Sequence, residues 1–145
     1  MWRDIITAGW LLVLSAVDIK KKSVSLWLLG IGAVETTVIL LTDGLSGGID
    51  GWVLCRSMVP GAMFLVTAAA TGKAGYGDGI VLIMLGLMCG AKVCLLALTA
   101  GLFLLAIFSG VLLALRKVQR TSRIPFLPFL AVGWGMAACG KAGVL

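Results

Sequence analysis

Two aspartates in this chain stand where carboxylates are costly, and together they could perform hydrolytic chemistry. Asp18 closes the first apolar run, and Asp78 stands at the mouth of a later one. A carboxylate at the edge of hydrocarbon is expensive unless it has a function. Two carboxyl groups held together share one proton, so that one can deprotonate water while the other protonates the leaving amine of a peptide bond. The two residues therefore predict a two-carboxylate active site.

The stretch before Asp78 is rich in glycine and interrupts an otherwise apolar sequence. Gly75 and Gly77 bracket Tyr76 directly before the acid. Glycine allows backbone conformations that other residues resist, and it lets another chain approach closely. We therefore expect Gly75, Tyr76 and Gly77 to shape a loop that accepts an extended peptide beside the carboxylate. The alternative is that both acids are interfacial, with Asp18 pairing with lysines at 20–22 and Asp78 capping a helix.

The composition places these acids in a membrane protein. The chain has 145 residues, of which 61% are hydrophobic and 12% charged, too few polar residues to cover a soluble domain. Its apolar runs are continuous and lack the alternation of barrel strands, so we predict an all-α, polytopic fold with one domain over residues 1–145. The net charge is +6, and the basic residues that produce it lie at the ends of apolar runs. That placement indicates contact with lipid headgroups and no role in nucleic-acid binding.

Six apolar segments are predicted to cross the membrane. Their ranges are 4–17, 24–42, 52–71, 79–90, 93–115 and 124–139, with a polar turn at 43–51. The fourth segment is shorter than the ~20 residues of a full crossing, and only the stretch Gly90-Ala91-Lys92 marks its boundary with the fifth. The number of crossings therefore needs a second criterion.

The distribution of basic residues supplies that criterion. With six crossings, residues 20–22, 73 and 116–123 face one side and bring together eight of the twelve lysines and arginines. The positive-inside rule makes this side cytoplasmic and leaves both termini extracytoplasmic. Asp18 and Asp78 then both lie at the cytoplasmic boundary of the cell membrane.

One further acid lies inside the second segment. Glu35 would be costly facing lipid, so we expect it to face the interior of the bundle. It is a candidate residue of a substrate groove. The interpretation that we favour is structural, a hydrogen bond to Thr36, Thr37 or a neighbouring helix.

The cysteines are expected to be packing residues. All of them lie in apolar sequence, without a C-x-x-C pair, and the chain has no histidine to complete a zinc site. They are Cys55, Cys89, Cys94 and Cys139. No metal and no cofactor are predicted.

Three motifs resemble one protein family. The stretch Gly75-Tyr76-Gly77-Asp78 matches the G-x-G-D motif of intramembrane aspartyl proteases, and the size and order of the segments resemble the type IV prepilin peptidases among them. The family also has an aspartate after the first core helix, here Asp18. The I-P-F-L-P-F stretch at 124–129 resembles the family's I-P-F-x-P-F/A segment. The three elements occur in the family's order over nearly the whole chain.

The resemblance implies an aspartic endopeptidase with Asp18 and Asp78 as its catalytic dyad. The substrate would be a prepilin-like protein, whose leader is cleaved at the cytoplasmic face. Many members have a lysine two residues after the motif's aspartate, whereas Gly79 and Ile80 follow Asp78 here. Methyltransferase activity is not predicted, because the family associates it with an N-terminal extension carrying C-x-x-C pairs.

A rival hypothesis comes from another functional class. A non-enzymatic bundle, such as a subunit of an ion- or proton-coupled transporter, could use Asp18 and Asp78 as ion or proton sites. Replacing either aspartate by asparagine separates the two hypotheses only when cleavage is measured.

Overall fold

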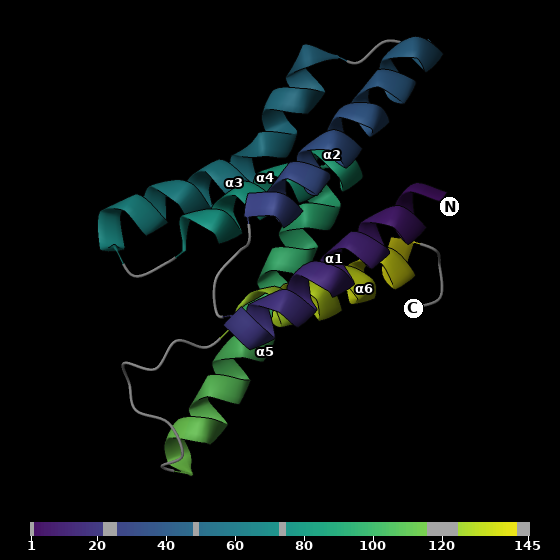
Figure 1. The fold of residues 1–145 in the computed structure, drawn as a ribbon. Helices are drawn as coiled ribbons and strands as arrows, with labels where there is room; N and C mark the ends of the chain where they lie inside the picture. Colours follow the sequence, from purple (N-terminus) through teal and green to yellow (C-terminus); the bar gives the residue numbers. More distant parts are fainter. Residues whose placement is uncertain (1, 22–25, 48–49, 73–74, 116–124, 142–145) are drawn as a thin grey trace.

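The computed structural model describes residues 2–21, 26–47, 50–72, 75–115 and 125–141, and these form an assembly of α-helices without a strand (Figure 1). The helices are α1 (Trp2–Lys21), α2 (Leu26–Gly47), α3 (Gly51–Thr71), α4 (Tyr76–Cys89), α5 (Ala91–Ala114) and α6 (Leu127–Lys141). The predicted all-α class with six helices is confirmed.

Among the described residues, three helices are long and apolar enough to cross a membrane. They are α2 over Leu26–Leu45, α3 and α5, whereas α4 and α6 are apolar but shorter. Helix α1 has 20 residues and carries charged side chains near both of its ends. The chain is accordingly a membrane protein. The orientation of its termini stays a prediction.

Several helices extend beyond the predicted segments. Helix α1 continues to Lys21, so Asp18 lies inside its last turns and not after the helix. Helix α2 continues to Gly47, so the first part of the predicted turn at 43–51 is helical. The cause is tertiary: the guanidinium of Arg3 forms an ion pair with Asp43 at 3.0 Å and also donates to the carbonyl oxygen of Met88 at 2.8 Å.

The predicted starts of two later helices were also wrong. Helix α4 begins at Tyr76 and not at residue 79, because Gly75 takes the N-cap position with extended backbone angles. Helix α6 begins at Leu127, after the predicted residue 124. Pro128 is then the second residue of α6, where the missing N–H of proline has no helical partner to lose.

Helix α4 is the centre of the bundle, although it is the shortest helix. It packs against α1, α2, α3 and α5. The contact with α3 is close because glycines face backbone: a Cβ on Gly86 would collide with the carbonyl oxygen of Ser57. A Cβ on Gly61 would lie 2.5 Å from the backbone nitrogen of Ile83. Helices in a membrane approach closely through such small residues, since lipid gives little hydrophobic drive for their association.

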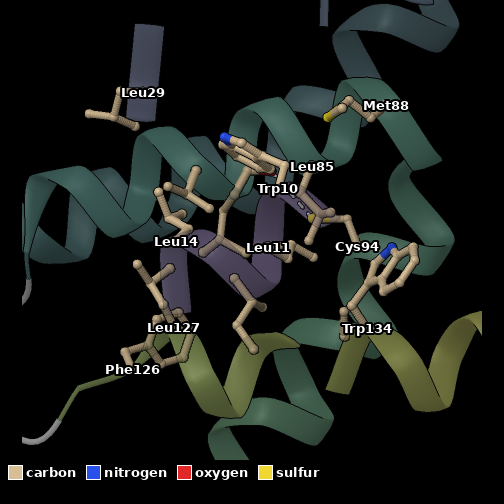
Figure 2. Packing of buried hydrophobic residues seen from close by; sticks show 14 of the residues in the cluster. Trp10, Leu11, Leu14, Leu29, Leu85, Met88, Cys94, Phe126, Leu127 and Trp134 are labelled. Carbon is tan, nitrogen blue, oxygen red and sulfur yellow. Dashed lines mark hydrogen bonds between the residues drawn. The ribbon is translucent and has the colours of Figure 1, made fainter. Parts of the chain in front are cut away.

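The apolar core lies between α1, α2, α4, α5 and α6. Trp10, Leu11 and Leu14 of α1 point into it, as Figure 2 shows. The indole N–H of Trp10 donates to the carbonyl oxygen of Leu28 at 3.0 Å, and its ring occupies the space where a Cβ of Gly32 would be. These contacts fix α1 against α2.

Close packing through small residues occurs at some glycines of the bundle and not at others. It holds at Gly32 and Gly86, and also between α5 and α6, where Gly133 meets the backbone of Gly101. At Gly30 and Gly135, however, an added Cβ would have nothing within 4 Å.

This difference predicts opposite effects of two identical substitutions. Gly86→Ala should destabilise the bundle by about 1–3 kcal/mol, because its Cβ forces α3 and α4 apart. Gly30→Ala meets no obstacle and should leave stability unchanged or slightly raise it, since alanine favours helix. Thermal unfolding of the purified variants in detergent measures both effects, and equal midpoints would contradict the packing described for α3 and α4.

Candidate active site

Asp18 lies in the last turns of α1 with only 5% of its surface exposed. Its carboxylate accepts a hydrogen bond from the backbone N–H of Leu127 at 3.2 Å. The backbone N–H of Phe126 also interacts with it. The alternative in which Asp18 pairs with lysines is therefore wrong for Lys20, the one described lysine side chain near it. The partners of Asp18 are the amides at the start of α6, which are free to bind an anion.

The segment before α6 is packed against other helices beside this carboxylate. Phe126 and Leu127 are buried. The ring of Phe126 stacks on Phe64 of α3, with centroids 5.6 Å apart. Figure 2 shows Phe126 and Leu127 at the start of α6, near Leu14 of α1. The I-P-F-L-P-F stretch thus positions the amides that hold Asp18.

Asp78 is the third residue of α4 and is half-buried. The helix is capped by Gly75 without a side-chain hydrogen bond, so the alternative that Asp78 serves as the N-cap is wrong. Its side chain turns back toward Gly75 instead, and a Cβ at Gly75 would lie 3.1 Å from Oδ2 of Asp78. Glycine at this position leaves room for the carboxylate.

The structure brings the two predicted carboxylates together. Asp18 and Asp78 are 60 positions apart in the sequence, yet they are close enough for a direct electrostatic interaction. Helices α1 and α4 pack against each other, and both acids lie at the same end of that contact. Two carboxyl groups in this arrangement repel each other when both are ionised.

The glycines near Asp78 act differently from the prediction. Gly75 has φ −74° and ψ 127°, which other residues also adopt, and Gly77 is helical. Their role is space and not unusual conformation. The left-handed backbone is instead found at Gly72, with φ 63°, where its N–H caps α3 by donating to the carbonyl oxygen of Ala68. Tyr76 is 59% exposed on the first turn of α4.

Glu35 faces partly inward from α2, and its Oε2 is buried without a hydrogen-bond partner among the described residues. The hydroxyls of Thr36 and Thr37 donate to the carbonyl oxygens of Gly32 and Ala33 instead. The prediction of a structural hydrogen bond between Glu35 and these threonines is therefore wrong. That Glu35 lines a substrate groove stays a prediction.

The four cysteines are not gathered at one place in the described part of the chain. Cys94 is buried and donates from its thiol to the carbonyl oxygen of Leu82 at 3.4 Å, and Cys89 accepts from the indole N–H of Trp134 at 3.3 Å. Cys55 and Cys139 are exposed. The packing role is confirmed for Cys94 and wrong for the exposed pair.

The chain is similar to three curated proteins that share one name, prepilin leader peptidase/N-methyltransferase. The protein from Stutzerimonas stutzeri is 31% identical over 134 residues, which cover 86% of this chain and 45% of that protein. The one from Pectobacterium carotovorum is 30% identical over 92% of this chain and 49% of its own length. The one from Pseudomonas aeruginosa is 34% identical over 65% of this chain and 32% of its own length. The chain thus spans at most about half the length of these relatives.

Two other comparisons give no match. No family model matches the chain, and no solved structure is detectably similar to it.

The contact between Asp18 and α6 predicts how two substitutions should differ in stability. Asp18→Asn keeps an oxygen that can accept from Leu127, so its unfolding temperature should stay near that of the unchanged protein. Asp18→Ala removes the acceptor and leaves a buried N–H without a partner, which costs about 1–3 kcal/mol. Thermal unfolding in detergent distinguishes the two variants. An alanine variant as stable as the asparagine variant would show that the hydrogen bond between Asp18 and Leu127 does not stabilise the fold.

Proposed function

Because this chain belongs to the prepilin peptidase family, we propose that it is a membrane-embedded aspartic endopeptidase with Asp18 and Asp78 as its catalytic pair. The substrate is a prepilin-like protein, from which the enzyme removes the leader peptide. The observation that carries this proposal is that two carboxylates, distant in sequence, lie at the same end of the packed helices α1 and α4.

The surroundings of the two carboxylates favour a division of roles. Burial of Asp18 disfavours its ionised form, and the hydrogen bonds that it accepts from backbone amides at the start of α6 partly oppose this effect. No hydrogen-bond donor among the described residues contacts the Asp78 side chain, which has the negative charge of Asp18 nearby. Asp18 therefore suits the base, and Asp78 suits the acid that holds the shared proton.

The reaction that follows is general acid–base hydrolysis of a peptide bond. Asp18 takes a proton from water while the water oxygen attacks the scissile carbonyl carbon. Asp78 donates a hydrogen bond to the developing oxyanion and then gives its proton to the leaving amine. Both carboxyl groups end with exchanged protonation states, and proton transfer between them restores the starting form.

The exposed residues beside Asp78 suit the binding of an extended segment. Tyr76 presents its ring on the first turn of α4, and Gly75 has no side chain to hold a peptide backbone away. Glu35 offers a buried carboxylate oxygen without a partner among the described residues, so we include it as a candidate groove residue. The leader of a prepilin-like substrate would lie along these groups.

The mechanism predicts that Asp18→Asn and Asp78→Asn each reduce cleavage by at least about 100-fold, because asparagine cannot take up or deliver the proton. The double variant should be no worse than either single one, since the two residues act as a unit. Cleavage of a prepilin-like substrate by purified protein is followed by the size of the product.

Asp50→Asn is the matched control. Asp50 is an exposed acid that precedes α3 and makes no side-chain capping bond, so its loss should leave cleavage unchanged. Substantial cleavage by either single variant at the dyad would rule out the mechanism, as would inhibition by a chelator that added zinc reverses.

The proposed active site lies at the cytoplasmic face of the cell membrane, and its topology can be tested separately. In a background with the native cysteines replaced by serine, Lys20→Cys should react with an impermeant thiol reagent only from the cytoplasmic side. Asp50→Cys should react only from the opposite side. The reverse pattern in intact cells and inverted vesicles would overturn the orientation while leaving the dyad intact.

A further inference from the structure

A large cavity opens at the end of the bundle opposite the carboxylates. Its volume is about 780 Å³, and its walls come from the start of α3, the junction of α4 with α5, and the end of α6. Cys89 at the cavity is 11 residues from Asp78 along α4, which corresponds to ~17 Å. The cavity is therefore separate from the proposed catalytic pair.

The cavity combines an apolar wall with two cationic side chains. Val53, Leu96, Ala100 and Met136 are among the residues that form the wall, whereas Arg56 and Lys92 supply the positive charge. No acid lines the cavity, and neither cation has a carboxylate partner within the described ranges. The other described arginine, Arg3, is by contrast paired with Asp43.

The position of these groups in the helices matches the layers of a bilayer. Helices α3 and α5 are both long and apolar enough to span it, and α5 is the less buried of the two. Lys92 is the second residue of α5, and Arg56 is the sixth residue of α3. Cations so near the ends of spanning helices lie at headgroup level, with the apolar wall running toward the hydrocarbon.

We propose that this cavity binds one anionic phospholipid, with its phosphate between Arg56 and Lys92 and an acyl chain against Leu96 and Ala100. The unpaired charges favour an anion, and the apolar wall favours a ligand with a hydrocarbon tail. A phospholipid is also the molecule that surrounds the exposed face of α5. A second copy of the chain would bring the same positive charges to the contact.

The test uses the full chain, purified in mild detergent and titrated with dioleoyl phosphatidylglycerol in native mass spectrometry. Dioleoyl phosphatidylcholine and glycerol phosphate are the two comparison ligands, one with the tails but no net charge and one with the headgroup but no tails. We expect one phosphatidylglycerol per chain and much weaker binding of both comparison ligands.

Five variants separate the contributions of charge and cavity. Arg56→Gln and Lys92→Gln should each weaken phosphatidylglycerol binding about fivefold. The exposed Lys20→Gln at the other end of the bundle should have no effect. Ala100→Leu fills the cavity and should reduce binding with both cations present. Ala106→Leu, on an exposed position of α5 outside the cavity, should not.

Three outcomes would overturn the proposal. They are equal affinity for phosphatidylcholine, equal weakening by Lys20→Gln, and dimers of the chain that form without bound lipid and are lost in Ala100→Leu. Because none of these measurements depends on peptide cleavage, their failure leaves the proposed enzymatic function untouched.

Discussion

Helix α1 is held in an apolar bundle by one charged side chain at each end, and its position relative to α2, α4 and α6 depends on these two contacts. Arg3 joins the start of α1 to the ends of α2 and α4, and Asp18 joins the end of α1 to the start of α6. In hydrocarbon, apolar packing alone discriminates weakly between helix registers. Asp18 is a buried acid, which is costly without its partner, and Arg3 is a partly buried cation with two partners, so the two contacts restrict the position of α1.

The glycine contacts complement these polar ones. Arg3 and Asp18 fix where α1 lies along the bundle, whereas Gly61 and Gly86 set how near α3 lies to α4. Pro60 stands next to Gly61 inside α3, where the missing N–H interrupts the helical ladder. Figure 1 shows that α3 changes direction along its length, so its later part follows α4 while its beginning leans away. The cavity beside Arg56 lies where that beginning separates from the other helices.

The sequence pattern was sufficient for the six helices and for the common end of Asp18 and Asp78. Each long apolar run must form a helix in a membrane, and alternate crossings bring the ends of the first and third connections to one side. The sequence pattern was insufficient where a residue distant in the chain determines where a helix ends. The extension of α2 beyond residue 42 depends on Arg3, forty positions from Asp43, and no local pattern reports that pair.

The candidate site shows the same limit. The G-x-G-D motif marked Asp78, but not that Gly75 would take the cap and leave the carboxylate free. The amides of Phe126 and Leu127 carry no side-chain signature, although Pro128 one residue later is typical of a helix start and could have marked the first turn of α6.

The shortness of α4 has a consequence for how the protein is made. A helix of 14 residues is ~21 Å long and cannot cross a hydrocarbon layer of ~30 Å by itself. It also carries Asp78 in its first turn, and this acid disfavours entry into lipid without neighbours. Helix α4 must therefore leave the insertion machinery beside α3, with their glycine faces already matched. The central helix of the mature bundle is thus the one that depends most on an earlier helix during biogenesis.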